Sequence, residues 1–204
     1  MKLLGWNCRG IYNASTVQAL KAQIKGVRPD LIFLSETKAL ISRMDFVKCS
    51  FGFDNMLVIE AKGKASGLCV MWKNGFSVRE VEYNKNLIAV SVSSDSICEW
   101  LMVGFYGLSY FSKNKKAWEN LMALLESYPG PWMCMGDFNY VISEDEVSGG
   151  RKSCSSTTNY LKELMFEFGA IDLGFWGSKF TWVKGRWGNA SINSRLGKGI
   201  ANMS

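Results

Sequence analysis

Three short apolar runs in this sequence each end in an amide or a carboxylate side chain, and this pattern restricts the possible folds more than any other feature. The run at residues 132–135 follows Pro129-Gly130-Pro131 and leads into Gly136-Asp137-Phe138-Asn139. An apolar run of this length, bounded by turn residues, predicts a strand that is buried on both faces. The Asp137 carboxylate and the Asn139 amide are then expected at the carboxyl end of that strand.

The other two apolar runs repeat the arrangement. Residues 2–6 lead into Asn7, and residues 31–35 lead into Glu36, with a helical pattern between them. A strand, a helix and a second strand in this order predict a parallel pair. Because α/β sheets carry their chemistry at the carboxyl ends of the strands, we expect two carboxylates and two amides on one rim.

The remaining pattern predicts one layered α/β domain over residues 1–204. Hydrophobic residues make up 48% of the chain, which is enough to bury one sizeable core. Helices are expected from Ser15 or Thr16, as the cap, to Val27, over residues 112–128 and over residues 158–168. Strands are expected over residues 56–59, 67–72, 76–83, 87–92 and 100–106, largely as antiparallel neighbours, and over residues 180–183.

The sequence contains no histidine, which excludes several kinds of catalytic site. A Ser-His-Asp triad, a Cys-His pair and a histidine-ligated zinc site all need that side chain. Hydrolysis would then depend on a hard cation held by oxygen ligands. Glu36, Asp137, Asn7 and Asn139 are the residue types that build such a site.

The cysteine pattern and the amino terminus indicate an intracellular location. The six cysteines contain no CxxC pair, and we interpret them as reduced thiols. No leader-like segment starts the chain, and no apolar stretch approaches the roughly 20 residues that a membrane helix needs. We expect a nuclear or cytoplasmic protein that is not secreted and does not enter a membrane.

The net charge of +6 and the pI near 9.0 are compatible with a polyanionic partner. Two basic clusters are the candidate nucleic-acid contacts, and the second is interleaved with Trp182 and Trp187. They are Lys113, Lys115 and Lys116, and Lys184, Arg186, Arg195 and Lys198. The alternative is a solvated surface beside a tryptophan-containing core.

Seven motifs in order connect this sequence to a known family. They are Trp6-Asn7-Cys8-Arg9-Gly10, Leu34-Ser35-Glu36-Thr37, Gly67-Leu68 leading to Trp72, Phe105-Tyr106-Gly107, Gly136-Asp137-Phe138-Asn139, Asp172-Leu173-Gly174-Phe175 and Phe180-Thr181-Trp182. This succession resembles the endonuclease/exonuclease/phosphatase superfamily. More narrowly, it is similar to the apurinic-type endonuclease domain that precedes the reverse transcriptase in plant LINE-type (non-LTR) retrotransposons.

The resemblance implies a four-layer sandwich, in which two mixed β-sheets are flanked by helices, and a Mg²⁺ or Mn²⁺ site. By similarity, Glu36 would bind the metal, with Asp137 and Asn7 beside it. Asp137 would also orient or deprotonate the attacking water, and Asn139 would hydrogen-bond the phosphate or that water. Asn7 would support the metal-bound carboxylate, and Tyr106 would donate to a phosphate oxygen. The implied partner is DNA, bound weakly and without sequence preference, and intact relatives carry a covalently linked reverse transcriptase domain.

The sequence departs from the family pattern near its carboxyl end. The family's Arg-Leu-Asp-Arg segment reads Arg195-Leu196-Gly197-Lys198 here, and the family's later Ser-Asp-His motif does not occur. We therefore expect a domain that is incomplete at its carboxyl end, lacks a last strand segment, and has weak or no activity. Three alternatives stay open: a phosphatase of the same superfamily acting on another phosphoester, a non-catalytic nucleic-acid-binding remnant, and strand-end residues that serve only as turns or caps.

Overall fold

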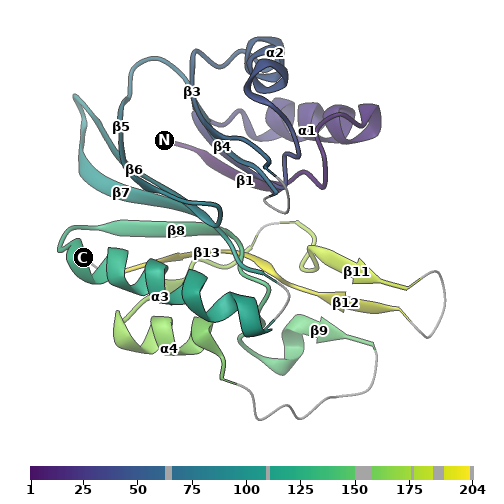
Figure 1. Ribbon diagram of the computed structural model, residues 1–204, viewed down its shortest axis with the longest axis vertical. Coiled ribbons are helices and arrows are strands. Elements are labelled where there is room, and N and C mark those ends of the chain that lie inside the picture. The colour runs from purple at the N-terminus through teal and green to yellow at the C-terminus, as the bar shows by residue number, and fades with distance from the viewer. Residues whose placement is uncertain (63–65, 109–110, 150–157, 176, 186–190, 203–204) are drawn as a thin grey trace.

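The computed structural model describes residues 1–62, 66–108, 111–149, 158–175, 177–185 and 191–202. Its elements form four layers, in which two β-sheets face each other and each carries helices on its outer face (Figure 1). This confirms the predicted α/β sandwich of two mixed sheets flanked by helices. None of the helices in the described ranges is long and apolar enough to span a membrane.

The first sheet has the strand order β1-β2-β4-β3. Its strands are β1 (Leu3–Asn7), β2 (Leu31–Ser35), β3 (Asn55–Ile59) and β4 (Leu68–Trp72). The strands β1 and β2 are parallel, as predicted, with Asn7 level with Ser35, and the other two pairs are antiparallel. Every residue of β2 is buried, because the sheet is covered on both faces.

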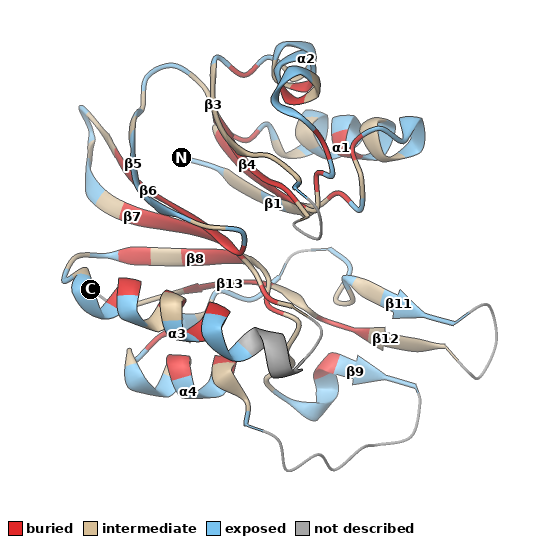
Figure 2. Ribbon diagram, viewed as in Figure 1, coloured by how far each residue is buried: buried red, intermediate tan, exposed pale blue. Residues whose placement is uncertain are grey.

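The helices α1 (Ala14–Val27) and α2 (Ile41–Phe51) cover the outer face of this sheet. The cap of α1 is Asn13, whose side chain accepts a hydrogen bond from the Ser15 amide, so the predicted cap at Ser15 or Thr16 is wrong by two or three residues. The helix ends at Arg28 in a left-handed conformation, just before Pro29, which cannot continue it. The helix α2 was not predicted; it buries Met44 and Val47 but exposes much of its surface (Figure 2).

The second sheet has the order β10-β13-β8-β7-β6-β5. Its strands are β5 (Ser77–Tyr83), β6 (Leu87–Ser94), β7 (Ile97–Tyr106), β8 (Trp132–Asp137), β10 (Ile171–Asp172) and β13 (Gly197–Ala201). The pair β7 and β8 is parallel, joined by the crossover helix α3 (Phe111–Ser127), and α4 (Tyr160–Glu167) lies beside α3. The short β9 (Val147–Ser148), β11 (Trp182–Lys184) and β12 (Ile192–Ser194) form a third sheet, and the 3-10 turn Glu144–Glu146 precedes β9.

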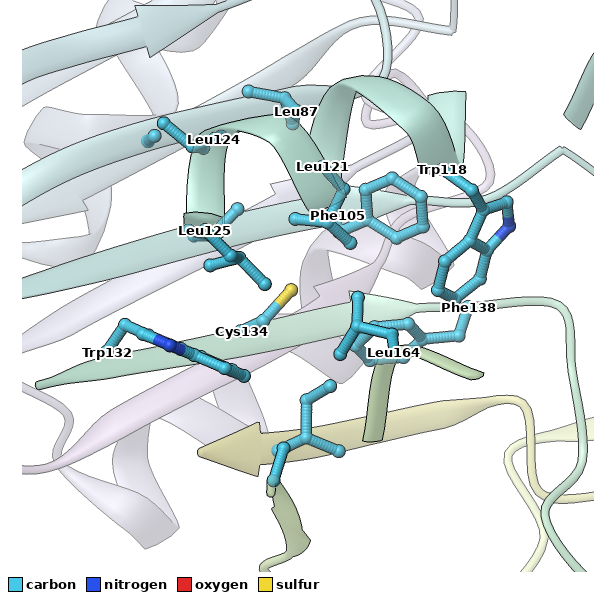
Figure 3. Packing of buried hydrophobic residues seen from close by; sticks show 14 of the residues in the cluster. Leu87, Phe105, Trp118, Leu121, Leu124, Leu125, Trp132, Cys134, Phe138 and Leu164 are labelled. Atoms are coloured by element: carbon cyan, nitrogen blue, oxygen red, sulfur yellow. The ribbon is translucent and has the colours of Figure 1, made fainter. Parts of the chain in front are cut away.

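The aromatic core under α3 fixes the direction of the chain at the end of β8. Phe138 is fully buried against Phe105 and Trp118, with ring centroids 5.6 and 5.9 Å away (Figure 3). Because neighbouring side chains of an extended segment point to opposite faces, anchoring Phe138 in the core turns Asp137 toward the space between the sheets.

Candidate active site

Three strand ends converge at one edge of the sandwich. Asn7 closes β1, Glu36 directly follows β2, and Asp137 closes β8. The Asn7 Nδ2 donates to Glu36 Oε1 and to Asp137 Oδ2, both at 2.9 Å. One amide therefore holds two carboxylates that come from different sheets and lie far apart in the sequence.

Two further predicted residues lie at this point. The Tyr106 hydroxyl, at the end of β7, donates to Glu36 Oε1 at 3.0 Å. The backbone N–H of Asn139 donates to Asp137 Oδ1 at 3.2 Å, and its side-chain amide donates to the Gly107 carbonyl. The structure thus brings together all five residues predicted for the catalytic and metal sites, while their chemical roles remain predictions.

The backbone around these side chains is held in an uncommon conformation. Glu36 and Asn139 have φ angles of 49° and 54°, in the left-handed region that non-glycine residues rarely adopt. Gly136 also has positive φ, and a Cβ there would lie 2.0 Å from the Phe105 carbonyl oxygen. A Cβ at Gly107 would lie 2.4 Å from the Phe138 carbonyl oxygen. Close packing of the β7 and β8 ends therefore explains both glycines of these motifs.

Burial and like charge act together on the two carboxylates. Burial raises the pKa of Asp137 above its ordinary value, hydrogen bonds from Asn7 and Asn139 oppose this, and the Glu36 charge adds to it. Burial, with the neighbouring Glu36 charge, likewise raises the pKa of the Tyr106 hydroxyl, which therefore stays protonated as a donor. Two cations balance part of the negative charge. The charge of Arg9 lowers the pKa of Asp137, and Lys38 Nζ lies 3.5 Å from Glu36 Oε2.

A cleft of about 390 Å³ opens above the carboxylates. Its far wall comes from the third sheet and the segment before β13, which lie beyond this end of the two main sheets (Figure 1). The lining residues are Asn7, Arg9, Glu36, Tyr106, Asp137, Asn139, Trp182, Ser194 and Leu196.

The donors at the base of the cleft fit a hard divalent cation. Mg²⁺ is typically held by one or two carboxylates together with water and substrate phosphate oxygens. Glu36 and Asp137 supply two carboxylates. One oxygen of each lies 2.9 Å from the same Asn7 nitrogen, so the two oxygens lie within the roughly 4–6 Å over which neighbouring charges influence each other. In the part of the chain that the structure describes, no group of three or more His, Cys, Asp or Glu residues forms a metal cluster. The fit is therefore to a cation with an open coordination sphere.

The structure corrects the predicted basic contacts. Arg195 and Lys198 were expected to face nucleic acid, but both are buried, with 6% and 7% of their surface exposed. Arg195 pairs with Glu146 and Asp172, and Lys198 pairs with Glu146. Their charges are neutralised inside the protein, so they are not available to a phosphate backbone.

The other basic residues of the two predicted clusters are either exposed or outside the described part of the chain. Lys115, Lys116 and Lys184 are exposed, so they stay candidates for nucleic-acid contact. Arg186 and the side chain of Lys113 lie outside the described part of the chain.

Arg9 and Trp182 line the cleft although the sequence analysis gave neither a site role. Arg9 could have been found, since it stands two residues after Asn7 in the first motif and its backbone N–H donates to the Asn7 amide oxygen at 3.1 Å. Trp182 comes from a segment far along the chain. Only the pairing of β11 with β12 brings it to the cleft.

Comparisons with known proteins agree with this geometry. A model of the Endonuclease/Exonuclease/phosphatase family matches residues 4–191. No curated protein sequence matches the chain.

Several solved structures share the fold. The endonuclease domain of TRAS1, a telomere-specific non-LTR retrotransposon, superposes with a TM-score of 0.71 at 13% identity, over 99% of this chain and 85% of that one. An AP endonuclease from Archaeoglobus fulgidus gives a TM-score of 0.72 at 14% identity, over 99% of this chain and 86% of its own. D. rerio TDP2 complexed with single strand DNA product gives a TM-score of 0.66 at 14% identity, over 99% of this chain and 83% of that one. At these identities the likeness concerns the fold.

Proposed function

The chain belongs to the endonuclease/exonuclease/phosphatase family, and from this premise we propose that it is a metal-dependent phosphodiesterase domain that nicks DNA weakly. The observation that carries the proposal is the single amide of Asn7 holding Glu36 and Asp137 at 2.9 Å each at the base of an open cleft. Two carboxylates in this arrangement serve phosphoester hydrolysis, which needs an aligned water and neutralisation of charge on the phosphate oxygens.

The residues divide the chemistry between them. Glu36 and Asp137 would hold Mg²⁺ or Mn²⁺, which when bound supplies positive charge to the scissile phosphate. Asp137 orients or deprotonates the attacking water, and Asn139 forms a hydrogen bond with the phosphate or with that water. Tyr106 keeps its proton, so its hydroxyl can donate to a phosphate oxygen. Asn7 keeps both carboxylates aimed at the cleft.

We propose weak activity because one position beside the site carries no side chain. Gly197 is paired with Asp137 across β13 and β8, so a side chain there would project from the same face of the sheet as Asp137. The 204 residues also contain no histidine to act as a general acid or base. Each positioned acid or base typically contributes about 10² to 10⁴ in rate.

The finer identity is also a proposal. The shared fold of the TRAS1 endonuclease domain supports an origin in a retroelement, and we propose the plant LINE type, in which intact relatives continue into a reverse transcriptase domain. DNA is the proposed substrate, contacted weakly and without sequence preference through exposed lysines such as Lys115, Lys116 and Lys184. A nuclear or cytoplasmic location completes the proposal.

A nicking assay on supercoiled plasmid tests the function. The wild-type chain with Mn²⁺ or Mg²⁺ is expected to produce open circles slowly, and a chelator should stop it. Asp137→Ala and Glu36→Gln are expected to abolish nicking, while Asp145→Asn, an exposed acidic position, should not change it. Nicking that persists unchanged in both site variants would contradict the proposal.

A second function is favoured by the same glycine. If the missing side chain opposite Asp137 has removed turnover, the domain would bind nucleic acid without cutting it. A gel shift of duplex DNA that weakens steeply with salt, together with no metal-dependent nicking, would support this non-catalytic alternative.

A further inference from the structure

Exposed aromatic and aliphatic side chains lie near Arg43, in the segments that follow Asn7 and Glu36 in the sequence. Tyr12, Leu40, Ile41 and Phe46 expose 59%, 54%, 53% and 61% of their surface. They come from the loop after β1 and from the first turns of α2, whose outer surface is open to solvent (Figure 2). We call these four residues and Arg43 the arginine–aromatic platform.

Arg43 joins the two aromatic rings into one surface. Its guanidinium carbon lies 5.5 Å from the Tyr12 ring centroid and 5.3 Å from that of Phe46, within the range of cation–π contact. One guanidinium nitrogen donates to the Ile11 carbonyl at 3.2 Å, which fixes the arginine in place. In the described ranges no carboxylate pairs with Arg43, and its buried Nε has no hydrogen-bond partner.

The platform is connected directly to the candidate active site. The Gly10 and Ile11 amides donate to the Glu36 and Thr37 carbonyls at 2.8 and 2.9 Å, so the loop that carries Tyr12 lies against the segment that carries Glu36. Leu40 is four residues after Glu36, and an extended chain spans at most about 14 Å over that length. Leu40 therefore lies within about 14 Å of Glu36, a distance that about four nucleotides cover at the roughly 3.4 Å spacing of successive phosphates along a duplex axis.

The charges favour a nucleic acid over an apolar protein partner. Arg43 is part of the platform itself. The exposed Lys38 lies 3.5 Å from Glu36 and two residues before Leu40, and the exposed Arg9 lines the cleft three residues before Tyr12. Cations that follow a phosphate backbone, combined with aromatic rings open to solvent, are the combination that binds single-stranded nucleic acid without sequence preference.

We propose that the arginine–aromatic platform stacks an unpaired base of single-stranded or frayed DNA, a few nucleotides from the phosphate held in the cleft. The proposal rests on the proposed function, because it takes the strand in the cleft to be DNA. It adds that the preferred ligand has an unpaired base on this side of the scissile phosphate.

The test is binding of a short fluorescent single-stranded oligonucleotide, measured by anisotropy with a chelator present so that no cleavage occurs. Tyr12→Ala and Phe46→Ala are each expected to weaken binding at least about fivefold, the lower end of what one lost stacked base costs. Tyr83→Ala and Phe166→Ala are matched controls, since these aromatics are also exposed but lie on β5 and α4, and they should leave the affinity within twofold. The conservative variants Tyr12→Phe and Phe46→Tyr keep a ring and should bind like the wild type.

An oligonucleotide with one abasic position separates stacking from general loss of fold. When the missing base is the stacked one, the abasic oligonucleotide should bind the wild type more weakly than the complete oligonucleotide does, while Tyr12→Ala should bind the two oligonucleotides equally. The dependence of binding on salt should stay the same, because no phosphate contact is lost. Unchanged affinity of both alanine variants, or equal losses in the two controls, would overturn the platform. Plasmid nicking by wild type and Asp137→Ala is scored separately, so failure of the platform and failure of the proposed function give different results.

Discussion

The buried charge cluster behind the cleft provides a sharp test of what holds the site in place. Glu146 has 4% of its side chain exposed and accepts from Arg195 Nη1 at 2.8 Å, from Lys198 Nζ at 3.0 Å and from the Ile142 amide at 2.6 Å. Asp172 completes the cluster through Arg195 at 2.6 Å. The two cations and the two carboxylates balance one another, and they join the 3-10 turn and β10 to Arg195 and to Lys198 of β13.

Glu146→Gln removes one charge while keeping the size of the side chain. It leaves two buried cations facing a single carboxylate, and the new amide can turn a donor toward groups that already donate. Removing one partner of a buried ion pair costs about 3–5 kcal/mol. For a chain of this size each kcal/mol lowers Tm by about 2–4 °C, so we expect a loss of roughly 6–20 °C.

The neighbouring Asp145→Asn is the matched control. Asp145 also forms a salt bridge, at 2.6 Å to Lys179, but 69% of its side chain is exposed, so solvent screens the pair and the variant should unfold near the wild-type temperature. Burial already lowers the pKa of Lys198 despite the Glu146 charge. The loss of Tm in Glu146→Gln should therefore become smaller as the pH rises toward 10.5, the ordinary pKa of lysine. At that pH Lys198 can be buried in its uncharged form, which costs less free energy than burying its charge. Equal Tm values for the two variants, measured by thermal unfolding at pH 7, would refute the argument.

Three further outcomes follow from the site and from the free edge of the first sheet. With a chelator present, the Tm of Asp137→Asn relative to the wild type should be higher at pH 7 than below about pH 3.8, because burial raises the pKa of Asp137 and only its ionised form opposes folding; a Tm difference that does not change with pH would contradict this. Gly197→Asp should tighten Mn²⁺ binding in titration calorimetry, since the atoms nearest to a Cβ there belong to Thr181 and lie at 3.4 Å or more, and unchanged heats would count against a site beside it. Among the described strands only β2 pairs with β1, and an apolar cleft of about 350 Å³ lies beside Leu3, so the isolated chain should bind a hydrophobic dye and scatter light with rising concentration; a monomer that binds no dye would refute this.

The strands and their polar ends could be predicted because the signals for them are local. β2 is an unbroken apolar run, and β1 and β8 are short runs bounded by turns and polar residues, so their boundaries and the residues after them follow from hydrophobicity alone. Sheet geometry then requires parallel ends to meet at one edge. That step places Asn7 beside Glu36. Asp137 lies on β8 of the second sheet, so its position beside them depends on the packing of one sheet against the other.

The parts that the sequence analysis missed depend on tertiary contacts. The helix α2 begins without a side-chain cap, and its exposed Ile41 and Phe46 blur the apolar pattern from which a helix is predicted. The strand β13 has two glycines in five residues and is fixed by its pairing with β8. The burial of Arg195 depends on Glu146, a carboxylate 49 residues away. No local pattern marks a cation whose partner is so distant.

The fold tolerates an uncommon backbone conformation at the base of the cleft because the neighbouring residues hold it in place. Glu36, Lys38 and Asn139 all have positive φ, and the half-buried Asp137 carries a carboxylate whose pKa is raised. Each of these features costs stability, and strain of this kind persists only where the surrounding structure fixes it. Here the fixing comes from both sides: Phe138 is anchored in the aromatic core, and Asn7 bridges the two sheets. A bound cation would relieve the repulsion between the carboxylates, so the edge is least stable without its ligand, as expected of a site built for binding rather than for folding.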